Sequence, residues 1–125
     1  MKIFKTIIRN LLGLCIPEGD YVAAIIDVDI KRINQKHLSF VKIKFKLTNV
    51  DTGARFTHVE TIIDDFDLIC CSNLAWIFEL FRIYCGDYYD LVGFVVDVSI
   101  EHDVVDGKKT AVLFCNDIIS FPPEL

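Results

Sequence analysis

The stretch that decides the fold is Phe40-Val41-Lys42-Ile43-Lys44-Phe45-Lys46-Leu47, near the middle of a chain of 125 residues. Successive side chains of a β-strand point to opposite faces of a sheet, so this alternation predicts a strand with one buried face and one basic face. The side chains expected on the buried face are Val41, Ile43, Phe45 and Leu47, and those expected on the basic face are Phe40, Lys42, Lys44 and Lys46.

A second alternating stretch precedes this strand. After a turn-like Pro-Glu-Gly-Asp, residues 21–30 carry an apolar side chain at every second position. We expect that series to face the core: Val22, Ala24, Ile26, Val28 and Ile30. Tyr21 and Ile25 are then predicted on the outer face with Asp27 and Asp29, whose carboxylates would repel phosphates.

Turn signals divide the rest of the chain. Asn49-Val50-Asp51-Thr52-Gly53 and Asp106-Gly107 are typical of hairpins. Between them, β-branched residues become rarer and acidic residues precede a long apolar stretch, as expected at a helix N-terminus. The sequence therefore predicts strands over 55–63, 90–101 and from 109 to 115 or beyond, with a helix over 68–84.

The order of these elements, β-β-β-α-β-β, is typical of a mainly β OB fold, a five-stranded Greek-key barrel with one helix between strands three and four. The predicted helix is apolar nearly all round, which fits a position at the bottom of the barrel. Gly93 suits a bend in strand four. A β-sandwich and an open sheet with one helix are the alternatives.

Residues 17–125 are expected to form this one domain, preceded by an amphipathic helix over 1–16. The apolar side chains of the helix recur at helical spacing, and basic residues lie at their margin. Such a helix can pack on the barrel or on a twin subunit, and we therefore expect a homo-oligomer. A membrane surface or a partner protein is the alternative for this helix.

Composition excludes several classes of protein. A hydrophobic fraction of 53% excludes disorder, while no apolar stretch is long and clean enough to predict a membrane span. Cysteine occurs five times without framework spacing, which favours a reducing cytoplasm. Charge is uneven: residues 1–62 hold ten Lys and Arg against six Asp and Glu, and the remainder holds three against twelve.

No enzyme, cofactor or metal is predicted. The chain contains no GxxxxGK[ST], GxGxxG or GxSxG motif. Its three histidines lie in different segments, and Cys70-Cys71 has no CxxC partner, so a zinc site is not expected. The acidic pairs Asp64-Asp65 and Asp27/Asp29 resemble nuclease ligands, but helix capping and solvation explain them.

Several short segments carry a family resemblance. They are Ile16-Pro17-Glu18-Gly19-Asp20-Tyr21, the lysine-rich strand, the Asp-Thr-Gly turn, Tyr84-Cys85-Gly86 and Leu91-Val92-Gly93. Over about residues 16–118 the chain resembles small proteins of the replication and recombination modules of bacteriophages of Gram-positive bacteria. The resemblance implies an OB-fold protein that binds single-stranded DNA in the cytoplasm of the bacterial host, with replication or recombination proteins as further partners.

The chain departs from this family at both ends. Residues 1–15 have no counterpart in it, and 117–125 is not the acidic tail by which many such proteins recruit partners. Recruitment of partners through the tail is therefore not expected.

Single strands are held by cations along the phosphates and by aromatic rings under the bases. Both kinds of side chain are expected on strands two and three, the usual ligand face of this fold. The candidate nucleic-acid-binding residues are Phe40, Lys42, Lys44, Lys46, Arg55, Phe56 and His58. Alternatively, the lysines are a solvated face or protect a sheet edge. A second hypothesis is a phage or mobile-element protein whose acidic half binds a basic host protein as inhibitor or adaptor.

Overall fold

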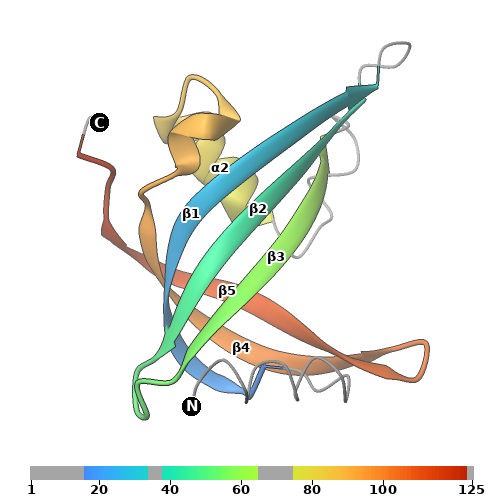
Figure 1. Cartoon of the computed structure of the whole chain (residues 1–125), viewed down its shortest axis with the longest axis vertical. Helices are drawn as coiled ribbons and strands as arrows, with labels where there is room; N and C mark the ends of the chain where they lie inside the picture. The colour runs from blue at the N-terminus through green and yellow to red at the C-terminus, as the bar shows by residue number, and fades with distance from the viewer. Residues whose placement is uncertain (1–15, 34–37, 65–74, 124–125) are drawn as a thin grey trace.

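The computed structural model describes residues 16–33, 38–64 and 75–123. Five strands form one antiparallel sheet in the order β3-β2-β1-β4-β5 (Figure 1). The elements are β1 (Gly19–Ile33), β2 (Leu38–Asn49), β3 (Arg55–Asp64), α2 (Ala75–Tyr84), the short 3-10 helix η2 (Tyr88–Leu91), β4 (Val95–Val105) and β5 (Lys108–Ser120).

The mainly β class and the helix between strands three and four are confirmed. The prediction of a closed barrel is not: the described part of the sheet is open, with β3 and β5 as its two edges. The amphipathic helix expected over 1–16 and the first part of the helix expected over 68–84 lie outside the described residues, apart from Ile16.

The fourth strand begins later than the sequence predicts, because residues 88–91 form η2 instead. The carboxylate of Asp87 accepts a hydrogen bond from the Tyr89 backbone N–H at 2.8 Å. In return, Asp90 accepts from the N–H groups of Asp87 at 3.1 Å and of Gly86 at 3.0 Å. This reciprocal capping ends the connection from α2 and explains why Asp90 is not part of a strand.

The predicted facing of β1 is wrong in its first half. Tyr21 and Ile25 are buried, at 0% and 1% exposure, whereas Ile26 is 43% exposed. A β-bulge between Ile25 and Asp27 is the cause: one extra residue exchanges the faces of the strand. Only Asp27 and the residues beyond it have the predicted orientation. The buried Tyr21 hydroxyl donates to the Pro17 carbonyl at 2.8 Å, so its burial leaves no unsatisfied group.

β1 also divides the sheet into two layers. It pairs with β2 over 21–33 but with β4 only over 19–24. As Figure 1 shows, β4 and β5 therefore cross behind β1, β2 and β3, and α2 lies at one end. The inner faces of both layers form the core, whose largest fully buried side chains include Tyr21, Phe45, Phe94, Ile77, Leu91 and Leu113.

α2 joins the two layers through Trp76. The indole ring lies 6.1 Å from the ring of Phe45 on β2. Its Nε1–H donates to the backbone carbonyl of Leu113 on β5 at 3.3 Å. One side chain thus contacts a central strand of the first layer and the edge strand of the second.

The two layers meet at Gly93, just before β4. The Gly93 N–H donates to the Ile25 carbonyl at 2.9 Å, and the Ile25 N–H donates to the Phe94 carbonyl at 2.9 Å. Gly93 has a φ of 104°, which side chains rarely adopt, and a Cβ there would lie 3.2 Å from Cβ of Pro122. Glycine is required because the backbone turns sharply against the last residues of the chain.

Candidate nucleic-acid interface

The outer face of β2 carries the predicted row of cations. Lys42, Lys44 and Lys46 are exposed, and they alternate with side chains of 0% exposure such as Ile43 and Phe45. Phe40 occupies the same face at the start of the row and is half-buried. β2 has a continuous register with β3, so no bulge interrupts the row.

The predicted residues of β3 are divided between the two faces. Arg55 is the cross-strand partner of Thr48, which shares its face with the lysines. Phe56 pairs with the buried Leu47, and His58 pairs with the buried Phe45. Phe56 and His58 therefore lie on the inner side of the sheet and do not join the lysines on one surface.

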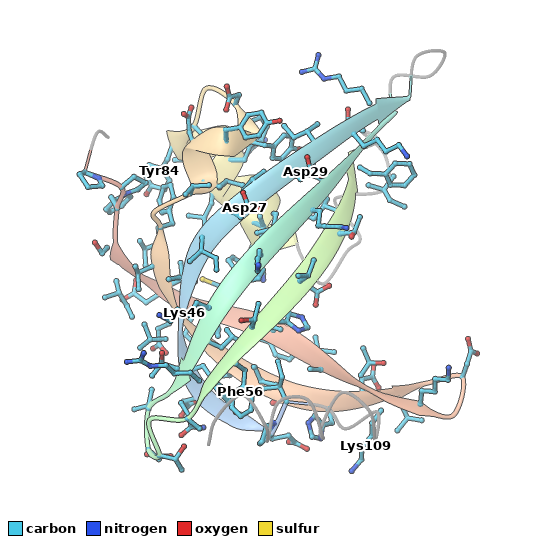
Figure 2. The ribbon with its side chains drawn as sticks, viewed as in Figure 1. Asp27, Asp29, Lys46, Phe56, Tyr84 and Lys109 are labelled. Carbon is cyan, nitrogen blue, oxygen red and sulfur yellow. The ribbon has the colours of Figure 1, made fainter. Side chains whose placement is uncertain are left out.

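Contacts on the inner side of the sheet explain why Phe56 and His58 point inward. The ring of Phe56 packs edge-on against Tyr21, with a centroid distance of 6.1 Å. Nε2 of His58 lies 2.7 Å from a carboxylate oxygen of Glu60, and the two side chains are 19% and 24% exposed. Figure 2 shows Phe56 near the end of β3 that follows the β2–β3 turn.

Sequence reasoning missed the residues of β3 that flank the lysines. Thr57, Val59 and Thr61 are the partners of Lys46, Lys44 and Lys42. Val59 is 45% exposed and Ile63, opposite Phe40, is 42% exposed, so the surface beside the cations is partly apolar. A register for β3 against β2 would have identified these residues, but the mixed pattern of β3 does not define one.

Two carboxylates face the same lysines from the other side. Asp27 of β1 pairs with Lys44, and Asp29 pairs with Lys42, whereas Lys46 pairs with Ala24. Directly opposed side chains in an antiparallel sheet have Cβ atoms about 4.5–5.5 Å apart, close enough for their charges to offset each other. Figure 2 places both aspartates along the part of β1 beyond the bulge and Lys46 toward the opposite end of the sheet. Lys46 and Arg55 thus lack an opposing carboxylate on the adjacent strand.

Over its described residues up to 62, the first layer carries no net charge. Of the cations in residues 1–62, Lys2, Lys5, Arg9 and Lys36 lie outside the described residues. Over the described part of that range, 16–33 and 38–62, six Lys and Arg balance six Asp and Glu. A polyanion would therefore meet a basic strip on a neutral layer.

The second layer has the opposite charge on its outer face. Glu101 and Asp103 of β4 line a shallow, open pocket together with His102, Val112 and Phe114. His102 is engaged at the start of β1, with Nε2 2.6 Å from the Ile16 carbonyl and Nδ1 3.5 Å from Glu18. Within residues 16–33, 38–64 and 75–123, no three His, Cys, Asp or Glu side chains gather as a metal site would require.

Neither cysteine that the structure describes is an activated nucleophile. Burial, reinforced by the nearby Asp90 and Asp87 carboxylates, raises the pKa of the Cys85 thiol to about 11. Burial, with Asp117 close by, also raises the pKa of the Cys115 thiol. Both groups are therefore protonated near neutral pH, when a nucleophilic cysteine needs its thiolate.

The chain matches no family model, and no curated protein is found to be similar to it. Within the described residues, no helix is both long and apolar enough to span a membrane.

Proposed function

We propose that the chain binds single-stranded DNA without sequence specificity and coats it during phage replication or recombination in the bacterial cytoplasm. The observation that carries the proposal is the row of exposed lysines on β2, continued by Arg55 and bordered by Phe40. Cations at alternate positions of one strand contact the phosphates of a single strand laid along it, and the ring of Phe40 offers a base a stacking surface.

We further propose that the domain is an OB fold opened at one seam. Its strand order, β3-β2-β1-β4-β5, is the order of that barrel when the third and fifth strands are left apart. The OB fold holds oligonucleotides on the face of strands two and three, where the lysine row lies. The surface offers charge and apolar area, and these features do not distinguish one base from another.

Fluorescence anisotropy of a labelled thymidine oligonucleotide, compared with a labelled duplex at low and higher salt, tests the proposal. We expect binding to the single strand that weakens with salt, because phosphate contacts release counterions. The double variant Lys44→Glu/Lys46→Glu should weaken binding by about 100-fold, since two attractive contacts become repulsive. Absence of binding to either oligonucleotide at low salt would contradict the proposal.

A charge-matched control is available at the β4–β5 turn. Lys108→Glu/Lys109→Glu makes the same change in net charge on the other layer, where both side chains are exposed. We expect its affinity for the single strand to change by less than about threefold, the scale of a distant, screened charge. An equal loss in both double variants would show that net charge, rather than the row on β2, governs binding.

The acidic outer face of the second layer supports a second candidate function, capture of a basic host protein as inhibitor or adaptor. Glu101 and Asp103 lie there beside the 43% exposed ring of Phe114. In a pull-down with a purified basic candidate partner, capture should survive Lys44→Glu/Lys46→Glu and be lost in Glu101→Lys/Asp103→Lys. The opposite pattern would exclude this surface as the docking site.

A further inference from the structure

β3 is an edge strand whose outer side is unpaired within the described sheet. Residues 55–64 form a continuous ladder with β2, and no other described strand pairs with them. Every second residue of such an edge directs its backbone N–H and C=O away from the sheet, available to another strand. β3 contains no proline, lysine or bulge, three of the features that protect an edge from pairing.

The sequence of β3 is complementary to itself about Val59. When two antiparallel copies are aligned with Val59 opposite Val59, Thr57 lies opposite Thr61 and His58 lies opposite Glu60. The same alignment places Phe56 opposite Ile62, two apolar side chains on the core side. These pairs join two threonines, a histidine with a carboxylate, and two apolar side chains, as stable cross-strand pairs do. At the end of the pairing, Arg55 lies opposite Ile63.

His58 and Glu60 are already in contact within one chain. Within one chain, Nε2 of His58 lies 2.7 Å from a Glu60 oxygen, and both side chains are partly exposed. In the aligned pair, each histidine also faces Glu60 of the other copy, so the contact occurs twice about a two-fold axis. This self-complementary pattern suits a second copy of the same chain.

We propose that two copies of this chain pair antiparallel through their β3 edges, with Val59 on the two-fold axis. The partner is a second copy because the two-fold alignment forms the His58–Glu60 and the apolar pairs of both strands at once. Strand addition of this kind gains affinity from main-chain hydrogen bonds and specificity from the side chains. The proposal does not depend on nucleic-acid binding.

The alignment has a consequence for the shape of the assembly. In this alignment odd-numbered residues face odd-numbered residues, and even-numbered residues face even-numbered ones. The outer faces of both copies therefore lie on the same side of one continuous sheet. The two lysine rows are then separated by three strand spacings, about 14 Å. Thr57, Val59 and Thr61 of both copies would fill the surface between the rows.

A cysteine on the axis tests the register. In the proposed dimer the Cα atoms of the two residues at position 59 are about 4.5–5.5 Å apart, within the range that a disulfide spans. Two residues at position 61 are offset by four residues, about 13 Å. With oxidised glutathione as the oxidant, Val59→Cys should form a disulfide between the introduced cysteines of the two copies, identified by peptide mass spectrometry, and Thr61→Cys should not cross-link to itself. Equal cross-linking at both positions, or none at position 59, would overturn the register.

Mixing two charge variants tests the interface itself. Sedimentation equilibrium should give the wild type a mass of twice the 14.3 kDa chain. His58→Glu places two glutamates opposite each other, and Glu60→Lys places lysine opposite histidine, so each variant alone should dimerise at least about 10-fold more weakly. An equimolar mixture should restore the dimer, because the introduced glutamate of one chain then faces the introduced lysine of the other, and the remaining His58 faces the remaining Glu60.

The mixture distinguishes contacts between the two chains from the contact within one chain. The internal His58–Glu60 pair is broken in both variants, so only contacts between chains can restore the dimer. A restored dimer also shows that both variants are folded. Glu101→Lys, the same charge change at an exposed site on β4, serves as control and should leave the wild-type dimer intact. A monomeric wild type, a mixture no tighter than its components, or an equal loss in the control would each overturn the proposal.

Discussion

The two halves of β1 have different neighbours. Over residues 21–24 the strand is central, paired with β2 on one side and β4 on the other, whereas beyond the bulge it pairs with β2 alone. In the first half the buried side chains have odd numbers, such as Tyr21, and in the second half they have even numbers, such as Val28. One inserted residue, Ile26, allows the same strand to serve two layers.

This difference shows how a single five-stranded sheet can bend into two layers. A bulge bends the strand and increases its twist. It lies where β4 leaves β1, and Gly93 and Phe94 bond to the C=O and N–H of Ile25. The curvature of the first layer and the crossing of the second therefore have a common origin at one residue of β1.

The largest effect is expected from truncating the two neighbouring isoleucines. Ile25→Ala should lower the free energy of unfolding by about 2–5 kcal/mol, because it opens a cavity in the core. Ile26→Ala should cost less than about 1 kcal/mol, because that side chain is 43% exposed. Urea unfolding monitored by circular dichroism checks both values. Similar costs for the two variants would contradict the bulge, since an uninterrupted strand places Ile26 rather than Ile25 inside.

A smaller effect is expected where β4 departs from β1. Gly93→Ala should destabilise the fold by about 1–3 kcal/mol, because alanine strains the backbone there. Gly53, in the β2–β3 turn, also has a positive φ, 71°, but a Cβ there meets nothing within 4 Å. Gly53→Ala should therefore cost less, about 1 kcal/mol. The midpoints of thermal unfolding of the two variants measure the difference, and a larger cost at Gly53 would mean that contact with Pro122 does not constrain the junction.

The smallest effect concerns the second half of β1 and depends on the proposed DNA binding. Asp27→Asn/Asp29→Asn removes the charges opposite Lys44 and Lys42. Affinity for the thymidine oligonucleotide should rise by about 3- to 10-fold at low salt, and the gain should shrink as salt screens the charges.

The matched control is Asp103→Asn/Asp106→Asn, which removes two exposed carboxylates from the other layer. Anisotropy titrations of both variants provide the measurement. If the wild type binds the single strand and the two variants tighten binding equally, the aspartates of β1 have no local influence on the lysine row.

The orientation of β2 was predictable because its sequence allows only one of its two faces to be buried. Its outer series is mostly lysine and its inner series is entirely apolar, so shifting the strand by one residue would bury charges. β1 is different: Tyr-Val-Ala-Ala-Ile-Ile at 21–26 is apolar at odd and even positions alike. Either face can then be buried, and the choice depends on Gly93 and Phe94, about 70 residues away in the sequence.

The candidate site was likewise predictable only in the part that lies on β2. The lysine row follows from the pattern of β2, but the placement of Phe56 and His58 depends on the register between β2 and β3. Apolar residues of β3 occur at even-numbered and odd-numbered positions alike, including Phe56 and Val59, so no local signal defines that register. The sequence does not predict η2 for a related reason: the apolar stretch after Asp90 favours a strand, and alternation alone does not reveal the reciprocal cap of Asp87 and Asp90.

The position of Trp76 gives the protein a built-in optical reporter. It is the only tryptophan of the chain, and it contacts Phe45 in one layer and the Leu113 carbonyl in the other. Its fluorescence therefore responds when α2 separates from either layer, even if both layers keep their backbone hydrogen bonds. Comparing emission with far-ultraviolet circular dichroism during denaturation would reveal whether the two layers come apart before their strands melt.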